Sequence, residues 1–174
     1  MAKAWWLLAA VSFGCSDPDG ADEEPRPAAS LTLTLSEPDG TPACAAAAPS
    51  PYLLGSEENP LTDGARGAEV SCSIHETDGD SWFTGSVAGT EANGGGQLRL
   101  VISSENGLAV TVVSDLTGTL ARDPASTDSC APLFTATIGD AISADFDCPL
   151  LSDPSDATKG CGARGTVTFE NCEL

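Results

Sequence analysis

The sequence is poor in basic residues and in aromatic ones. Only 7 Lys and Arg stand against 26 Asp and Glu in 174 residues, so the formal net charge is −19, and aromatic residues make up 5%. Nucleic-acid phosphates and anionic lipid headgroups are recognised through clusters of Lys and Arg. The charge balance therefore argues against nucleic acid and against an anionic lipid surface as partners. The length fits one folded domain with flanking segments.

Histidine and catalytic motifs are also scarce. His75 is the only histidine, which excludes a three-histidine metal site and leaves one imidazole for any Ser-His-Asp device. Segment 85–89 (Gly-Ser-Val-Ala-Gly) fails the Gly-x-Ser-x-Gly pattern because its serine directly follows the first glycine. Cys72 and His75 are an odd number of positions apart, so on a regular strand their side chains lie on opposite faces. We predict no catalytic residues, no cofactor and no enzyme activity.

Residues 1–14 have the arrangement of an export signal. Lys3 gives a short positive start, residues 4–13 form an apolar run of about ten residues, and Gly14 ends it before Cys15. A membrane-spanning helix needs about 20 apolar residues, and no later segment is apolar over that length. We therefore interpret residues 1–14 as a signal peptide.

A small residue directly before a cysteine, at the end of such a run, resembles the lipobox of bacterial lipoprotein precursors. In that family the cysteine thiol is diacylated and the preceding peptide is removed. The family usually has Leu three positions before the cysteine and a small residue two before it, where this chain has Ser12 and Phe13. The resemblance implies lipidation of Cys15 and export to the bacterial cell envelope, with the membrane contacted only through the lipid. An ordinary secretory signal, with Cys15 as a spare thiol, is the alternative.

The next segment is acidic and contains proline. Residues 16–29 hold five acids, three prolines and one arginine, with no aromatic residue to bury. Such a charged chain repels itself and stays extended, so we predict a tether. The predicted organisation is a signal peptide at 1–14, the lipidated cysteine and tether at 15–29, and a folded domain at 30–174.

Six cysteines remain after Cys15, an even number that fits disulfides in an oxidising compartment. They are Cys44, Cys72, Cys130, Cys148, Cys161 and Cys172. Zinc sites favour close pairs such as Cys-x-x-Cys, whereas Cys161 and Cys172 are eleven positions apart and Cys148 and Cys161 are thirteen positions apart. We predict three disulfides among the six. Six cysteines allow 15 pairings, of which we favour Cys148–Cys161 because it closes the polar loop between them.

Apolar and polar residues alternate with a period of two, which indicates half-buried strands. The alternating segments are 31–35, 70–75, 97–103, 108–112, 116–120, 134–138, 142–146 and 167–169. No stretch has the pattern of an amphipathic helix over three turns. Dipeptides such as Asp78-Gly79 and Gly139-Asp140 suit tight hairpin turns. We predict an all-β fold, an antiparallel β-sandwich of eight or nine short strands with disulfides.

Acidic loops leave two further possibilities for function. Glu76, Asp78 and Asp80 flank a turn with the oxygen ligands that calcium prefers, and the acids of 145–156 are a weaker second candidate. We favour solvated loops and predict no metal. Paired carboxylates also serve glycosidases, but Trp82 is the only tryptophan after the signal peptide, which is little from which to build a sugar platform. We predict a non-catalytic binding or structural role, and the sequence does not identify the protein or glycan partner. A glycan hydrolase and a calcium-dependent adhesion module are the alternatives.

Overall fold

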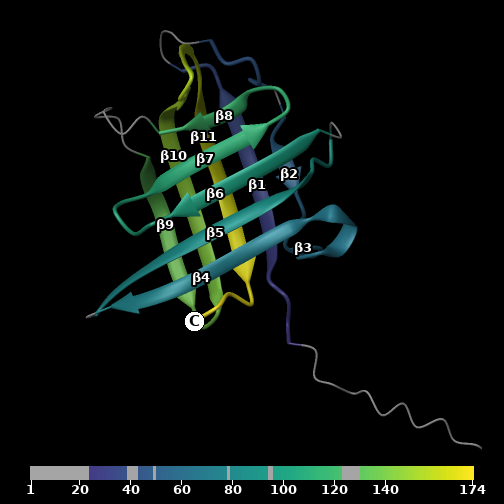
Figure 1. The fold of residues 1–174 in the computed structure, drawn as a ribbon, viewed down its shortest axis with the longest axis vertical. Coiled ribbons are helices and arrows are strands. Elements are labelled where there is room, and N and C mark those ends of the chain that lie inside the picture. Colours follow the sequence, from purple (N-terminus) through teal and green to yellow (C-terminus); the bar gives the residue numbers. More distant parts are fainter. Residues whose placement is uncertain (1–23, 39–42, 49, 78, 94–95, 123–129) are drawn as a thin grey trace, which may run out of the picture.

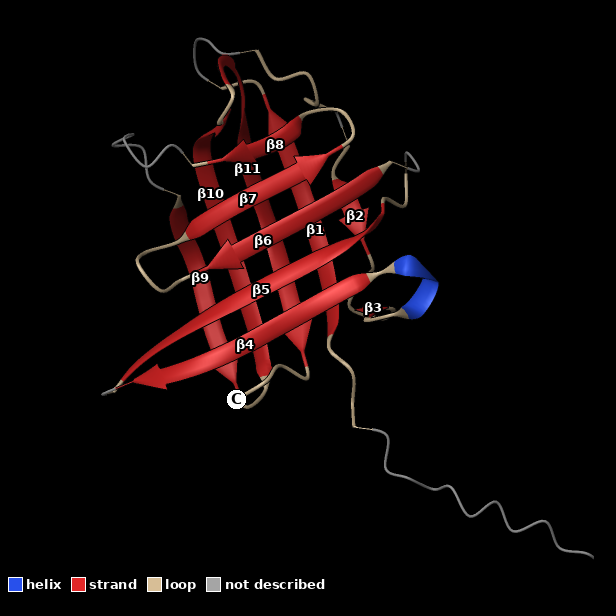
Figure 2. Cartoon of the chain, in the orientation of Figure 1, coloured by secondary structure: helices blue, strands red, loops and turns tan. Residues whose placement is uncertain are grey.

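The structure is a computed structural model and describes residues 24–38, 43–48, 50–77, 79–93, 96–122 and 130–174. The expected signal peptide, Cys15 and most of the expected tether lie outside these residues. Within them the helical structure is one short 3₁₀ turn, η1 (Ala65–Gly67), and the regular structure is otherwise β-strand (Figure 2). The described residues contain no helix with the length and apolar character needed to cross a membrane.

Eleven strands follow one another in the described part of the chain. They are β1 (Ala28–Ser36), β2 (Tyr52–Leu54), β3 (Leu61–Thr62), β4 (Glu69–Thr77), β5 (Asp80–Thr90), β6 (Gln97–Ser103), β7 (Ala109–Ser114), β8 (Gly118–Ala121), β9 (Ala131–Ile138), β10 (Ala141–Asp153) and β11 (Asp156–Glu170). The sheet order is β2-β1-β11-β10-β8-β7-β6-β5-β4, with β3 also on β1 and β9 also on β10. These strands pair antiparallel, so the predicted all-β antiparallel class is confirmed.

The sheet folds over into two layers (Figure 1). Strands β1, β9, β10 and β11 form one layer, and β4 to β8 cross it obliquely. The long strand β10 joins the layers, because it pairs with β9 through residues 141–147 and with β8 at Ser152, opposite Ala121. The two layers are therefore parts of one hydrogen-bonded sheet rather than two separate sheets.

The C-terminal segment fastens the layers at β4, the last strand in the sheet order. The amide of Ile74 donates to the Glu173 carbonyl at 2.8 Å, and the amide of Glu173 donates to the Cys72 carbonyl at 3.0 Å. The disulfide Cys72–Cys172 lies beside these bonds. The far edge of the folded sheet is thus tied to the end of β11.

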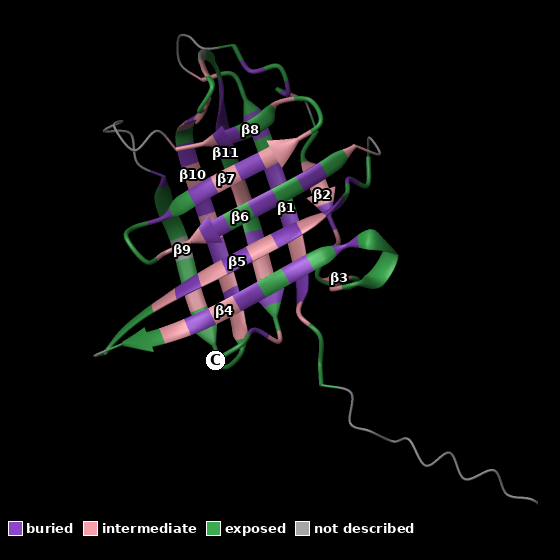
Figure 3. Cartoon of the chain, in the orientation of Figure 1, coloured by how far each residue is buried: buried purple, intermediate pink, exposed green. Residues whose placement is uncertain are grey.

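Burial alternates along most of the strands as the period of two predicts (Figure 3), but not along β9, where Ile138 is 78% exposed and the predicted half-buried pattern is wrong. In β1, Leu31, Leu33 and Leu35 are buried while Thr32 and Thr34 are exposed. The core between the layers is mainly aliphatic. Its largest fully buried side chains are those of Phe83, Phe146, Phe169, Leu31, Leu33, Leu35, Leu54, Leu100, Ile102, Leu120, Ile142 and Leu151.

Trp82 lies outside this core. Its ring stacks on that of His75, with centroids 3.9 Å apart, because the two residues are directly opposite each other in the β4–β5 hairpin. Cys72 is buried while His75 is half-buried. The predicted placement of Cys72 and His75 on opposite faces is therefore correct, and Trp82 contributes to the hairpin rather than to the core.

The predicted number of eight or nine strands is too low for the eleven described, because the alternation pattern missed β2, β3 and β5. Strand β5 contains Gly85 and Gly89, and glycine weakens a strand unless close packing requires it. A Cβ added at Gly85 would lie 2.5 Å from Cε2 of Phe169, and one added at Gly89 would lie 3.0 Å from Cδ1 of Leu61. Packing of side chains from other strands against β5 therefore explains glycines that sequence reasoning treats as strand breakers.

The six cysteines form three disulfides: Cys44–Cys161, Cys72–Cys172 and Cys130–Cys148. The prediction that all six are bridged is confirmed, whereas the favoured Cys148–Cys161 pairing is wrong. The segment between these two cysteines is not a loop that needs a bridge, because β10 and β11 extend into it as paired strands. In this ladder Cys148 lies opposite Ala163 and Cys161 lies opposite Leu151, so the two cysteines do not face each other.

The ordered domain begins before the expected boundary at residue 30. Strand β1 starts at Ala28, and its first two residues are buried. The carbonyl of Pro27 accepts a hydrogen bond from the amide of Asp63 at 2.9 Å. The side-chain amide of Asn171 donates to the carbonyl of Arg26 at 3.0 Å. The last residues assigned to the tether are therefore part of the fold.

Candidate functional site

A groove lies on the outer face of the β1–β11–β10 layer, at the opposite end of β1 from Ala28. We call it the distal groove. It is lined by Thr34, Ser36, Glu37, Pro38, Asp147, Cys148, Pro149, Leu150, Gly162, Ala163 and Arg164. Its volume of about 610 Å³ lies within the range of about 300–1,000 Å³ that is usual for small-molecule sites.

A bulge in β10 and a glycine in β11 shape the distal groove. The register between the two strands shifts after Cys148, which leaves Pro149 and Leu150 outside the regular ladder. Proline has no N–H for a ladder and occurs at such bulges. A Cβ added at Gly162 would lie 2.8 Å from Oγ of Ser36 and 3.3 Å from the Pro149 carbonyl oxygen. Glycine at 162 therefore keeps space open between the end of β1 and the bulge.

The ion pair Arg164–Asp147 lies in this groove. The two residues are opposite each other in the β10–β11 ladder. Nε of Arg164 donates to Oδ2 of Asp147 at 3.1 Å, and Nη2 donates to the same oxygen. The side chains are 69% and 33% exposed, and exposed pairs contribute only about 0–1 kcal/mol to stability. Within the described residues, Oδ1 of Asp147 and Nη1 of Arg164 have no hydrogen-bond partner.

Glu37 is fixed at one wall of the groove. Its Oε2 accepts a hydrogen bond from the amide of Cys44 at 2.9 Å, and Cys44 is bridged to Cys161 of β11. This hydrogen bond and the Cys44–Cys161 disulfide therefore connect Glu37 to β11, the strand that forms the floor. Glu37 and Asp147 are each engaged by a bond within the protein.

The first set of calcium candidates does not converge. In the β4–β5 hairpin Glu76 lies opposite Ser81, and Asp80 lies opposite Thr77. Successive pairs in a ladder project to opposite faces, so the side chains of Glu76 and Asp80 point to opposite sides of the hairpin. Asp78 lies outside the described residues. No three or more His, Cys, Asp or Glu residues in the described part of the chain are placed to hold a metal ion.

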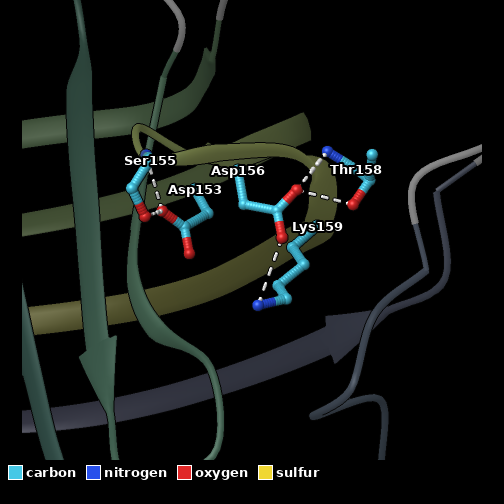
Figure 4. A network of polar contacts seen from close by, with 5 residues as sticks. All are labelled: Asp153, Ser155, Asp156, Thr158 and Lys159. Atoms are coloured by element: carbon cyan, nitrogen blue, oxygen red, sulfur yellow. Dashed lines mark hydrogen bonds and ion pairs between the residues drawn. The ribbon is translucent and has the colours of Figure 1, made fainter.

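Two acids of the second candidate, Asp153 and Asp156, are at the tip of the β10–β11 hairpin (Figure 4), whereas Asp145 and Asp147 lie farther back along β10. Oδ1 of Asp153 accepts from the amide and hydroxyl of Ser155 at 2.7 and 2.6 Å. Oδ1 of Asp156 accepts from the amide and hydroxyl of Thr158 at 3.0 and 2.6 Å, and its Oδ2 lies 3.2 Å from Nζ of Lys159. The hydroxyl bonds are the largest causes that lower the pKa of each carboxyl below its ordinary value. These carboxylates bind their own hairpin and share no common centre.

Glu91 is the buried charged residue of the described chain, 6% exposed. Its Oε1 accepts from the amide of Leu53 at 3.2 Å and its Oε2 accepts from the amide of Asn93 at 2.9 Å. Burial, and secondly the charge of Glu91, raise the pKa of Tyr52, whose hydroxyl donates to the Ala46 carbonyl at 2.8 Å. Sequence analysis did not single out Glu91, and these bonds give it a structural role at β2.

The distal groove was not predicted as a site, although Asp147 belongs to the weaker calcium candidate 145–156 and Cys148 to the predicted disulfides. Thr34 and Ser36 are ordinary exposed positions of a strand, and Glu37 is one of many acids. A usable signal was the proline after Cys148 within an otherwise alternating stretch, because proline in a strand indicates a bulge. The second usable signal was Arg164, because the chain has only 7 basic residues.

Comparisons with known proteins assign no family to the chain. The arrangement described above is therefore interpreted from its own residues. The chain matches no protein-family model, no curated protein and no solved structure.

Proposed function

We propose that the chain is an exported bacterial lipoprotein, held in the cell envelope by a lipid on Cys15, whose domain has a non-catalytic binding or structural role. The observation that carries the proposal is the cysteine pairing. Three disulfides account for six of the seven cysteines, and Cys15 is the seventh. Disulfides persist in oxidising compartments, which supports export. The cysteine outside the bridged set is also the one that follows the signal-like run.

The location of the distal groove supports a binding role over a purely structural one. The described chain enters the domain at the start of β1, and the groove is at the end of the same strand. At about 3.3 Å per residue, the strand separates these two points by about 26 Å. An anchor at Cys15 followed by an extended tether would present the groove on the side away from the membrane.

Lipidation is tested by metabolic labelling of the full chain with a palmitate analogue in a bacterial host, followed by fractionation. We expect label and protein together in the membrane fraction for the wild type. Cys15→Ala should lose the label and leave the membrane fraction, and the neighbouring Ser16→Ala should behave like the wild type. Equal labelling of Cys15→Ala, or an unlabelled wild type, contradicts the proposal.

The non-catalytic role is tested separately by incubating the purified full chain with envelope glycans and ester substrates. We expect no turnover above that of a heat-denatured sample. Turnover that disappears on changing Glu37→Gln or Asp147→Asn would replace the binding role with hydrolysis. A large rise in melting temperature at micromolar Ca²⁺ would instead favour the calcium-dependent module, because specific ligands stabilise the folded state by mass action.

A further inference from the structure

The distal groove presents a hydrogen-bond acceptor beside a donor. Asp147 uses Oδ2 for the ion pair, so its Oδ1 can still accept a hydrogen bond from a ligand. Arg164 uses Nε and Nη2, so its Nη1 can still donate one. A carboxylate accepts and a guanidinium only donates. Adjacent hydroxyl groups of a sugar match this pair, because one hydroxyl donates to the carboxylate while its neighbour accepts from the guanidinium. The hydroxyls of Thr34 and Ser36 line the same groove.

The charges of the groove favour an uncharged ligand. Its lining contains two carboxylates, from Glu37 and Asp147, and one guanidinium, from Arg164. An anion that approaches Arg164 also approaches both carboxylates, in a chain whose formal net charge is −19. A cation that approaches Asp147 meets the guanidinium paired with it. A neutral ligand with alternating donors and acceptors satisfies the pair without an unpaired charge.

The strand pairing beneath the groove and its apolar lining favour an oligosaccharide over a peptide. Peptides that bind β-proteins often add a strand to a free sheet edge, but β11, which forms the floor, is paired with β1 on one side and β10 on the other. The recognition groups are side chains on the outer face. Pro38, Pro149 and Leu150 add apolar surface to the lining, which suits the C–H faces of sugar rings.

We propose that the distal groove binds a neutral glycan, and that Asp147 and Arg164 form hydrogen bonds with two adjacent hydroxyl groups of one sugar. This inference rests on the proposed binding role of the domain. It adds the class of ligand and the residues that recognise it.

The test measures binding of the full lipidated chain, in a detergent without a sugar headgroup, to neutral disaccharides to tetrasaccharides of glucose, galactose, mannose and N-acetylglucosamine. Oligogalacturonates serve as the anionic counterparts. We expect at least one neutral oligosaccharide to bind below about 10 mM, and about tenfold or more weaker binding after Arg164→Gln or Asp147→Asn. Asp145→Asn is the matched control, because it lies on the same strand two residues away and outside the lining. Melting curves establish that each variant is folded.

Each remaining outcome overturns the glycan proposal. These outcomes are no binding by any neutral oligosaccharide, binding unchanged in folded Arg164→Gln and Asp147→Asn, and oligogalacturonate binding as tightly as the neutral sugars. Capture of a peptide through the same residues would assign the groove to a different partner. If the oligosaccharide-binding test fails, the result of palmitate labelling at Cys15 is unaffected. Failure of the lipoprotein proposal is detected by the palmitate labelling and not by the oligosaccharide-binding test.

Discussion

Gly85 of β5 lies against the ring of Phe169 of β11, with no space for a side chain between them. A Cβ on Gly85 would be 2.5 Å from Cε2 and 2.6 Å from Cζ of Phe169, whose side chain is fully buried. The two residues belong to opposite layers of the folded sheet. The separation of the layers at this point is therefore set by a glycine on one side and an aromatic ring on the other.

Gly85→Ala should destabilise the domain. The added methyl group cannot fit without displacing a ring that is packed on all sides, and overpacking of this kind costs about 1–3 kcal/mol. Urea unfolding measures the loss. Ser86→Ala, on the opposite face of the same strand, should change stability by less than about 0.5 kcal/mol. An unchanged or higher midpoint for Gly85→Ala would show that the layers adjust freely here.

Removal of the disulfides should destabilise the domain in an order set by the length of chain they close. Cys44–Cys161 and Cys72–Cys172 span separations of 117 and 100 residues, against 18 for Cys130–Cys148. In the chain-entropy model a loop of 100 residues corresponds to about 4.7 kcal/mol and one of 15 to about 3 kcal/mol. Paired Cys→Ser variants, compared by urea unfolding, test this order. Equal losses for the three pairs would mean that strain or residual structure outweighs loop length.

Tyr52→Phe should lower stability at neutral pH by about 0.5–1.5 kcal/mol, because it removes the hydrogen bond from the Tyr52 hydroxyl to the Ala46 carbonyl. The pKa of Tyr52 is raised above its ordinary value of 10.0, so its contribution is present below pH 10 and is lost as the pH rises through the folded-state pKa. The difference between wild type and variant should therefore narrow in alkali. Unfolding titrations at pH 7 and above pH 10 measure it. A difference that is constant with pH would contradict this assignment.

Ser155→Ala should raise the pKa of Asp153 toward its ordinary value. The Ser155 hydroxyl bond is the largest cause of the lowered pKa, and the amide bond remains in the variant. Stability from this depressed pKa is present above the unfolded-state value and is lost as the pH falls through the folded-state value. Carboxyl resonances followed by NMR give the pKa directly. Thr158→Ala is the matched control and should act on Asp156 instead; identical effects of both variants on Asp153 would contradict the local origin.

Much of the fold could be predicted from alternation and turn residues, because one face of most strands is buried against the other layer; β9 is an exception, with Leu133 59% and Ile138 78% exposed. Gly79 and Gly139 have positive φ angles at the turns expected for them. Strand β5 could not be found in this way, because its glycines are explained by Phe169 and Leu61, which are distant in sequence. The disulfide pairing was equally non-local, since it depends on the register of β10 and β11 and on where segment 43–47 lies.

The candidate site depended still more on three-dimensional arrangement. Arg164 and Asp147 are 17 positions apart and become neighbours only through the register of two strands. Gly162 gains its role from Ser36, on a strand at the other end of the sequence. Local sequence patterns do not indicate such long-range contacts. Asp153 and Asp156, two of the acids that composition suggests as ligands, instead form hydrogen bonds within their own hairpin.

The pairing of β1 with β11 has a consequence for the order in which the chain folds. Strand β1, the first of the domain, pairs along its whole length with β11, the last, from Ala28 opposite Glu170 to Ser36 opposite Gly162. This ladder cannot form until the ribosome has made residues 162–170. Contacts between such distant segments are also slow to form, because a long loop must close first. Synthesis therefore leaves an interval in which the residues of β1 have been made but their ladder with β11 cannot yet form.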